Sequence, residues 1–386
     1  MKFDFSNEAF FDNHTHLLFQ DKLEVTEAEF VLNYYHGIRD EAKPDGTMRP
    51  SQTAIDHMSH QGVILTLVNL MAQRFDIEPT LKSVVAFRNQ NTKTPQALRD
   101  YTEMLFKDQN VWGSMLDAGN PMGDPKTFLP GKVFRLYQYE TPYLEFLKTE
   151  DKFDVILEKL FACIRKAAAE GFNGLKGHIA ELCGLAVREV SEKEAQAALP
   201  KAKQGDPEAF NTVYYAMFSH LLELCQEVKI PLHLHTGTTG MKQWTAAYSM
   251  DPILLAPYLK NPRYFKTKIF LLHGSFPFTR HAAIMAYNFP NIYLDLSWAL
   301  PWQSLLLPRI LEDVLSVAPH DKVFCGTGQH DYTETVWLAS KITKSCLANV
   351  MENLVSQNLL SQAQAAKSAS MILHQNGRRF YEEGKE

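Results

Sequence analysis

Residues 10–17 read FFDNHTHL, an apolar start followed by two histidines, His14 and His16, that stand one residue apart. Alternate side chains of a β-strand point to the same face, so both imidazoles can reach one metal ion. The pair alone is a weak signal, because His-x-His also occurs by chance on solvated strands. A metal site therefore requires further ligands from the rest of the chain.

Seven more short apolar runs with strand character follow, separated by stretches with helical character. They lie at 111–118, 132–139, 173–177, 230–235, 268–273, 292–297 and 322–327. Strands that alternate with helices pair in parallel through right-handed crossovers. Eight strands predict an α/β fold of the closed (β/α)8 TIM barrel type, with an open doubly wound sheet as the alternative.

Two segments exceed what such a barrel needs. Residues 20–110 separate the first two predicted strands and contain helical stretches at 52–74 and 96–108, so we predict a helical insertion after strand 1. From about residue 333 onward the pattern predicts extra C-terminal helices. We interpret residues 1–386 as a single barrel domain that carries this insertion.

Composition narrows the class of partner. The chain has 386 residues, 45% of them hydrophobic, and a net charge of −5 with both signs mixed along the sequence. We therefore expect a small-molecule substrate, and neither nucleic acid nor a membrane surface as a partner. Five cysteines without C-x-x-C spacing, and a start without a basic and apolar leader, favour the cytoplasm. Barrels with helical insertions often dimerise, so a homodimer is one expectation.

Histidines recur where a barrel places its functional residues, at the carboxyl ends of strands. Five of the 14 histidines fall at the ends of three predicted strands, and they are His14, His16, His233, His235 and His273. This coincidence favours a metal site over a chance pair. His233 and His235 share one face of their strand. We predict His235, nearer the mouth, as the ligand, with His233 one layer deeper.

Lys176 ends the fourth predicted strand, and burying its ammonium is costly unless it is paired or neutralised. It is either a surface lysine or a carbamylated one, and a carbamate would be an oxygen-donor anion able to bridge two divalent ions. His178, two residues later, is a candidate to support the ligands from behind. Asp117 and Asp295 also end strands, but such carboxylates often only orient a ligand or cap a helix.

Arg135 lies between apolar neighbours in the third predicted strand. An inward guanidinium there would bind a substrate carboxylate in bidentate fashion. The alternative is a structural ion pair with Asp117 or Glu140. We name Arg135 as the candidate substrate-binding residue.

These motifs together resemble the amidohydrolase superfamily, and more closely its amidohydrolase-related (amidohydrolase 2) group of metal-dependent barrel hydrolases. The resemblance spans nearly the whole chain, and it rests on Asp12-Asn13-His14-Thr15-His16, Gly174-Leu175-Lys176, Leu234-His235-Thr236-Gly237, Leu272-His273-Gly274 and Asn291-Ile292-Tyr293-Leu294-Asp295-Leu296-Ser297. Each piece is unspecific, whereas their order and strand placement together are quite specific.

The resemblance implies one or two divalent metal ions, of which zinc is the best match and manganese or iron the alternatives. A first metal would take His14, His16 and a carboxylated Lys176. A second would take Lys176, His235 and His273. In relatives with a single metal the sixth-strand histidine is instead catalytic or polarises the substrate, so the role of His273 depends on the metal count.

The chain departs from the family pattern after the eighth strand. The family has Gly-(Thr or Ser)-Asp there, with a carboxylate that binds metal and takes the proton of the attacking water, whereas this chain reads Gly326-Thr327-Gly328-Gln329-His330-Asp331. Three explanations compete: Asp331 reaches back as the catalytic base, His330 replaces it, or position 328 has changed and the enzyme is impaired. We favour a base missing at position 328 over rescue by Asp331.

The sequence thus predicts a metal-dependent hydrolase that cleaves an amide, other C–N or ester bond of a small, carboxylated substrate through metal-activated water. A decarboxylase of the same fold with one metal is the first alternative. A catalytically impaired or ligand-binding relative is the second, because of Gly328.

Overall fold

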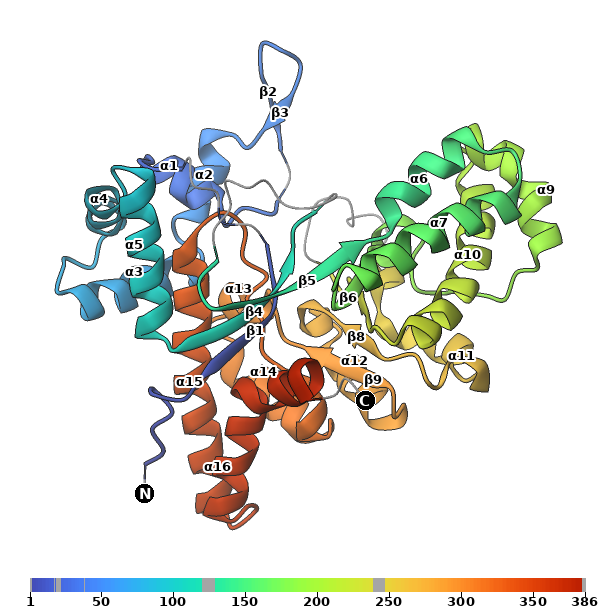
Figure 1. Ribbon diagram of the computed structural model, residues 1–386. Helices are drawn as coiled ribbons and strands as arrows, with labels where there is room; N and C mark the ends of the chain where they lie inside the picture. Colours follow the sequence, from blue (N-terminus) through green and yellow to red (C-terminus); the bar gives the residue numbers. More distant parts are fainter. Residues whose placement is uncertain are drawn as a thin grey trace.

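The computed structural model describes residues 2–16, 18, 22–37, 39–119, 129–238 and 247–383. Its main sheet has eight parallel strands in the spatial order of the chain, which confirms the predicted (β/α)8 barrel (Figure 1). The strands are β1 (Phe10–Thr15), β4 (Val111–Asp117), β5 (Lys132–Gln138), β6 (Gly174–Gly177), β7 (Leu232–Leu234), β8 (Ile269–Leu271), β9 (Ile292–Asp295) and β10 (Val323–Phe324).

The first and last strands meet through backbone and side-chain hydrogen bonds. The Asn13 N–H donates to the carbonyl of Cys325 at 2.9 Å. The buried Asp12 carboxylate accepts from the N–H and the hydroxyl of Thr327, at 2.7 and 2.6 Å. These bonds place the segment after β10 directly beside His14, the first predicted ligand.

Aromatic side chains fill the lower half of the barrel interior. Phe11, Phe134, Phe270 and Phe324 form a buried cluster with Tyr381. The Tyr381 side chain reaches this cluster from η8 (Arg379–Glu383), the last described segment. A cluster of this kind is a packed core rather than a channel, so we expect a functional site at the opposite end of the strands.

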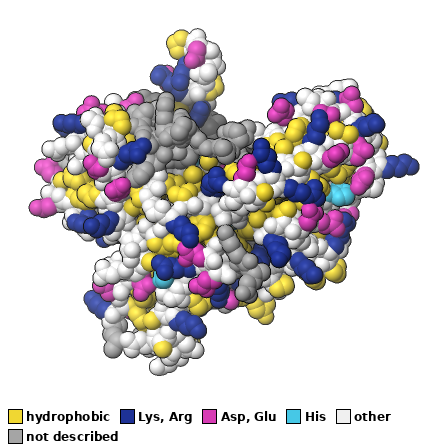
Figure 2. Space-filling view, viewed as in Figure 1, with side chains coloured by type: hydrophobic (Ala, Val, Ile, Leu, Met, Phe, Trp, Pro, Cys, Tyr) yellow, Lys and Arg dark blue, Asp and Glu magenta, His cyan; other side chains and the backbone are white. Residues whose placement is uncertain are grey.

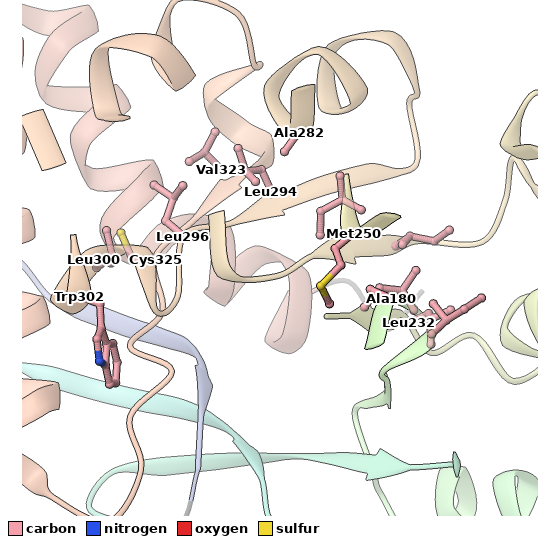
Figure 3. Close-up of a cluster of buried hydrophobic side chains, with 14 of the residues drawn as sticks. Ala180, Leu232, Met250, Ala282, Leu294, Leu296, Leu300, Trp302, Val323 and Cys325 are labelled. Atoms are coloured by element: carbon pink, nitrogen blue, oxygen red, sulfur yellow. The ribbon is translucent and has the colours of Figure 1, made fainter. Parts of the chain in front are cut away.

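Apolar side chains on the outer faces of the strands pack against the surrounding helices. Figure 3 shows part of this layer, in which Leu294 and Val323 of neighbouring strands lie close to Ala282 of α12 (Thr279–Asn288). Leu232, Leu294 and Val323 are fully buried. Such two-sided burial is typical of parallel strands, which have helices on the outside.

The described residues of the predicted insertion, between β1 and β4, form five helices and a small hairpin. Its elements are α1 (Glu27–Leu32), β2 (Glu41–Ala42), β3 (Met48–Arg49), α2 (Gln52–Met58), α3 (Gly62–Phe75), α4 (Leu81–Asn91) and α5 (Pro95–Asp108). The helical stretch predicted at 52–74 is divided into α2 and α3. Thr26 begins α1 with a capping box, and Thr94 caps α5 ahead of a proline. These local signals fix where the helices begin.

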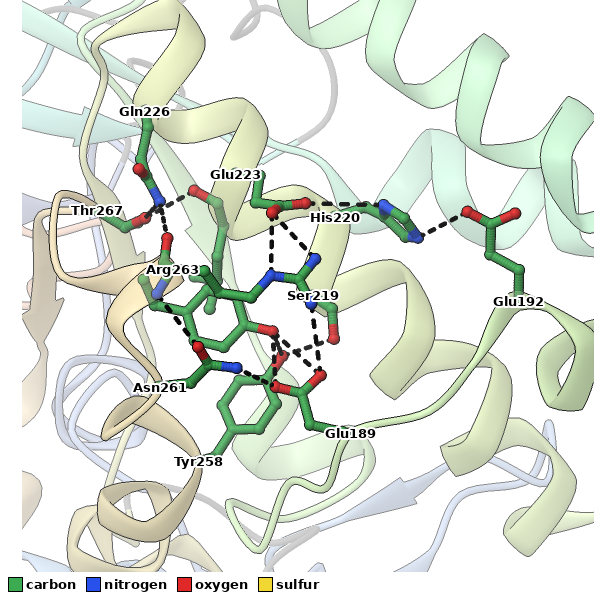
Figure 4. Close-up of polar contacts among 12 residues, drawn as sticks. Glu189, Glu192, Ser219, His220, Glu223, Gln226, Tyr258, Asn261, Arg263 and Thr267 are labelled. Atoms are coloured by element: carbon green, nitrogen blue, oxygen red, sulfur yellow. Dashed lines mark hydrogen bonds and ion pairs between the residues drawn. The ribbon is translucent and has the colours of Figure 1, made fainter.

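A second group of helices lies on the other side of the barrel in Figure 1. It comprises α6 (Glu140–Thr149), α7 (Phe153–Ala169), α9 (Glu192–Lys203) and α10 (Pro207–Val228). A polar network ties α10 to the loops beside it, with Arg263 bonded to Glu223 at 3.0 Å and Asn261 bonded to Glu189 at 3.0 Å (Figure 4). Gln226 of α10 also donates to Thr267 at 2.9 Å, so the network adjoins the amino-terminal end of β8.

The extra C-terminal helices are also present. They are α15 (Thr333–Ser356), α16 (Gln362–Ser370), η7 (Met371–Gln375) and α17 (Asn376–Arg378). The helix α15 contacts α3 and α5 of the insertion, while η7 contacts β1 and β10. The C-terminal segment thereby covers the amino-terminal end of the barrel.

Charges of both signs are interspersed over the face of the molecule in Figure 2. Among the described residues, none of the helices combines the length and apolar character that crossing a membrane requires.

Candidate metal centre

Three side chains converge at the carboxyl ends of β1 and β4. One ligand atom each from His14, His16 and Asp117 lies within 4.8 Å of the others. Among the described residues, this is the one group of three or more His, Cys, Asp or Glu side chains with that spacing. Two imidazoles and a carboxylate suit a divalent transition metal, with zinc as a good match.

The unsatisfied polar atoms of this group fit a metal ion. Both ring nitrogens of His14 are buried and have no hydrogen-bond partner within the part of the chain that the structure describes. Asp117 Oδ2 accepts no hydrogen bond there either, although it forms an ion pair with Lys176 Nζ at 3.4 Å. Burying polar atoms without hydrogen-bond partners is costly, so coordination of a cation accounts for the two His14 nitrogens and this oxygen better than simple packing does.

Electrostatics hold these groups in the protonation states that metal ligands need. Burial, followed by the charge of Lys176, lowers the pKa of His14 well below its usual value. Burial also lowers the pKa of His16 to about 4. Burial opposes ionisation of Asp117, but Lys176 and the nearby histidines hold the pKa of its carboxyl well below the usual range. Neutral imidazoles and an ionised carboxylate result at neutral pH.

Lys176 lies inside the barrel, so the interpretation as a surface lysine is wrong. It is 1% exposed, and its Nζ lies 3.0 Å from His178 Nε2 and 3.4 Å from Asp117 Oδ2. His178 in turn bonds through Nδ1 to Glu140 Oε2 at 2.8 Å. His178 therefore contacts the site through Lys176, as its position two residues after that lysine suggested.

His235 and His273 line the site beside the group of three. Their ring centroids are 4.5 Å apart, and the His273 ring lies 5.1 Å from that of His14. The Ser297 hydroxyl lies 3.2 Å from His273 Nδ1 and sets the orientation of that ring. His235 Nε2 lies 3.5 Å from the Glu181 carboxylate. His235 and His273 thus lie next to each other and beside His14, but neither belongs to the cluster of three.

His233 lies one layer below the mouth, as predicted. Its Nε2 is 3.1 Å from the hydroxyl of Tyr381, which also donates to Asn13 Oδ1 at 3.0 Å. The Asn13 amide donates to Asp295 at 2.7 Å, and burial raises the pKa of Asp295 to about 6. This polar layer connects the aromatic core with the ligands above it.

The loop after β10 places His330, rather than Asp331, at the centre. The His330 ring stacks on His16 with centroids 3.8 Å apart. Asp331 bonds instead to Lys22 at 2.5 Å, so its carboxylate is engaged by the segment that leads into the insertion. The geometry therefore does not support Asp331 as the catalytic base, and of the two loop residues His330 is the better placed.

Gly328 has a backbone that disfavours a side chain. Its φ is +59°, and a β-carbon there would lie 2.8 Å from the backbone nitrogen of Trp298. Its N–H donates to the His14 carbonyl at 2.7 Å. Position 328 thus joins β1 to the last loop in a conformation suited to glycine, which argues against the simple loss of an aspartate at an otherwise intact site.

Arg135 lies away from the histidines, which corrects the expected inward orientation. Its guanidinium donates to the Glu170 carbonyl at 2.7 Å and stacks over the Phe172 ring at 4.4 Å. The alternation of β5 points Phe134 and Leu136 into the barrel core, so Arg135 faces outward. Neither of the structural partners expected from the sequence, Asp117 or Glu140, is bonded to it.

Asp117 and Gln329 contribute to the site in ways that the sequence does not predict. The sequence leads us to expect Asp117 to orient a ligand, cap a helix or pair with Arg135, although its position at a strand end is also a signal of direct coordination. The Gln329 side chain donates to the His16 carbonyl at 2.7 Å, and the His16 N–H donates to the Gln329 carbonyl at 3.0 Å. Nothing in the sequence indicates this pair, because it joins residues more than 300 positions apart.

Comparison with known proteins agrees with this site. Residues 165–382, more than half of the chain, match the family described as Amidohydrolase. The protein fluG of Emericella nidulans is 33% identical over 153 residues, which cover 39% of this chain and 17% of fluG. The chain thus matches a small part of the length of that relative.

Solved structures share the fold. A structure described as a metal-dependent hydrolase from Lactobacillus casei has a TM-score of 0.81 at 20% identity, covering 99% of this chain and 98% of the other. Glucuronate isomerase from Caulobacter crescentus gives a TM-score of 0.65 at 13% identity, with 99% and 92% covered. Uronate isomerase from Thermotoga maritima gives 0.62 at 15% identity, with 97% and 94% covered.

Proposed function

Because the chain belongs to the amidohydrolase family, we propose that it is a metal-dependent hydrolase that cleaves an amide, other C–N or ester bond of a small molecule. The observation that carries this proposal is the convergence of His14, His16 and Asp117 at the strand ends. The substrate carboxylate expected from the sequence loses its support, since Arg135 faces outward. We propose zinc as the metal, with manganese and iron as alternatives.

When bound, a divalent ion at such a site supplies a water of lowered pKa and polarises a carbonyl group. The chain's own residues hold the reacting groups around it. His330 is exposed at the mouth and stacked on His16, where it can take a proton from an attacking water. His273, oriented by Ser297, is placed to donate a hydrogen bond to the developing oxyanion. Asp117 and Lys176 form a buried ion pair at the same site.

The decarboxylase with one metal is the second candidate. It is favoured by a specific observation, which is that the described residues offer one group of three ligands and not two. Both candidates need the same His14, His16 and Asp117 cluster. They differ in the bond that breaks, because a decarboxylase cleaves the C–C bond to a carboxyl group and releases carbon dioxide, whereas a hydrolase adds water across an amide, other C–N or ester bond.

The test begins with metal-loaded protein and a panel of small amides, esters and lactones, alongside aromatic and unsaturated acids assayed for carbon dioxide. We expect hydrolysis that falls at least about 100-fold in Asp117→Asn, since a metal ligand is lost. The exposed Asp56→Asn is the matched control and should keep full activity. Release of carbon dioxide without hydrolysis would replace the hydrolase by the decarboxylase, and inactivity on the whole panel would favour a ligand-binding relative.

A further inference from the structure

We propose that Lys176 functions as an unmodified amine held by a Glu140–His178 pair, and that Asp117, in place of a lysine carbamate, supplies the anionic ligand of a single-metal site. The inference goes beyond the proposed function, because it concerns the covalent state of Lys176 and the number of metals rather than the bond that is cleaved. It also replaces the carbamate expected from the family resemblance.

The first step is the set of partners that Lys176 already has. Its Nζ is within hydrogen-bond distance of His178 Nε2, at 3.0 Å, and forms an ion pair with Asp117 Oδ2 at 3.4 Å. The lysine is 1% exposed and Asp117 is fully buried. An amine in this place has one acceptor and one counter-charge, so a second chemical group is not needed to explain its burial.

The second step is the orientation of His178. Glu140 Oε1 accepts from the His178 backbone N–H at 2.6 Å, and Oε2 bonds to Nδ1 at 2.8 Å. With its proton on Nδ1, the ring presents a lone pair on Nε2 towards Lys176. Glu140 is itself fixed by the Tyr214 hydroxyl at 2.5 Å. The chain thus provides a built acceptor for an amine N–H bond.

The third step is what a carbamate would change. Reaction of the neutral amine with carbon dioxide forms an N–C bond, releases one proton and turns the end of Lys176 into an anion. That anion would stand beside the Asp117 carboxylate, which would lose its counter-charge in a buried place. Two metal ions could offset two anions, but the described residues assemble one group of three ligands, and Asp117 is part of it.

The experiment uses the full-length protein equilibrated with ¹³C-bicarbonate, loaded with diamagnetic Zn²⁺ for NMR and, in a parallel sample, with Co²⁺ for counting metal ions. We expect no protein-bound carbamate signal in the ¹³C NMR spectrum and about one Co²⁺ per chain, whether or not bicarbonate is present. A carbamate signal that disappears in Lys176→Arg would overturn the proposal. A second Co²⁺ that is lost when bicarbonate is removed would do so as well.

A matched pair of variants tests the positioning role of Glu140. In Glu140→Gln the amide nitrogen cannot accept from His178, so we expect Co²⁺ to bind about 10-fold more weakly with an altered absorption spectrum. Glu192→Gln removes an exposed carboxylate that lies 3.2 Å from His220, far from the site. This variant should change neither the Co²⁺ affinity nor the absorption spectrum. Tyr214→Phe is a milder variant in case Glu140→Gln fails to fold, and it should shift the Co²⁺ spectrum in the same direction.

Unchanged Co²⁺ affinity and spectrum in both Glu140→Gln and Tyr214→Phe would contradict the positioning role. None of these measurements depends on turnover. Failure to find a hydrolysed substrate would therefore count against the proposed function alone and leave the inference about Lys176 intact.

Discussion

Single residues at this site owe their chemistry to burial and to one nearby charge. Burial and the charge of Lys176 both lower the pKa of His14, while the same lysine keeps Asp117 ionised. The charge of Lys176 therefore favours both the neutral imidazole of His14 and the ionised carboxylate of Asp117. The placement of Lys176 inside the barrel is a consequence of the strand β6, where alternate residues face the interior.

The backbone conformation of Gly328 makes this position sensitive to any side chain. We expect Gly328→Asp to leave activity no higher than in the parent and to lower the free energy of unfolding by at least about 1 kcal/mol, because a left-handed φ and a contact with Trp298 are both unfavourable. Urea unfolding and the substrate assay measure the two effects.

Gly205→Asp is the matched control, since Gly205 also has a positive φ but open space around its missing β-carbon. Gly205→Asp should lower the free energy of unfolding by less than Gly328→Asp does. A gain of activity in Gly328→Asp would instead revive the interpretation of a lost catalytic aspartate.

A buried lysine away from the site predicts a pH dependence of stability. Lys344 donates to the carbonyls of Gln109 and Ser6, and burial lowers its pKa from 10.5 to about 8. Between these values the unfolded chain holds a proton that the folded protein has released. The contribution of Lys344 to the free energy of unfolding therefore rises with pH in that window, by up to about 1.4 kcal/mol per pH unit.

Lys344→Met removes this contribution. Urea unfolding at pH 7, 8, 9 and 10 should show the stability of the parent relative to Lys344→Met increasing above pH 8 and staying constant below it. Lys148→Met, an exposed lysine, should show no such trend. A difference independent of pH would mean that Lys344 keeps its ordinary pKa.

At the scale of elements, the C-terminal segment completes the barrel. The Tyr381 hydroxyl on η8 bonds to both Asn13 and His233, and its ring belongs to the aromatic core. Tyr381→Phe keeps the ring but leaves two buried polar groups without this partner. We expect it to lower the free energy of unfolding by about 1–3 kcal/mol.

Thermal or urea unfolding measures that loss, and Tyr287→Phe, at a position that is 68% exposed, serves as the control. Equal stability of Tyr381→Phe and the parent would show that the hydroxyl contributes no net stability. Reduced stability in both variants would point to a general effect of losing a hydroxyl rather than to the polar layer.

At the scale of the whole molecule, the insertion meets the mouth of the barrel. Lys22 pairs with Asp331, and His36 lies against Trp302 with ring centroids 5.1 Å apart. The Trp302 indole donates to the Tyr34 carbonyl at 3.1 Å. Residues of the insertion therefore lie against the loops at the mouth of the barrel, where the His36 ring is 6.3 Å from that of His330.

Metal binding should stabilise the whole molecule, because the cluster exists only in the folded state. With free metal at 100 times its Kd, linkage gives about 2.7 kcal/mol. We therefore expect Tm to rise on adding Zn²⁺ and to fall on adding a chelator. The shift should vanish in His16→Asn and persist in the exposed His57→Asn. An equal shift in both variants would place the responsible metal elsewhere.

The sequence by itself determined the order of strands, the existence of the insertion and the strand-end histidines, because these follow from local periodicity and from where barrel strands end. His14, His16, Lys176, His235 and His273 all lie at the site for that reason. Only the tertiary structure decided the partners that lie far apart in the chain. It brought Asp117 together with His14 and His16 in one group with metal-ligand spacing, held Lys176 beside His178, turned Arg135 outward and brought His330, rather than Asp331, onto His16. These outcomes depend on loop conformations and on which face of a strand packs inward, and both are set by contacts between distant residues.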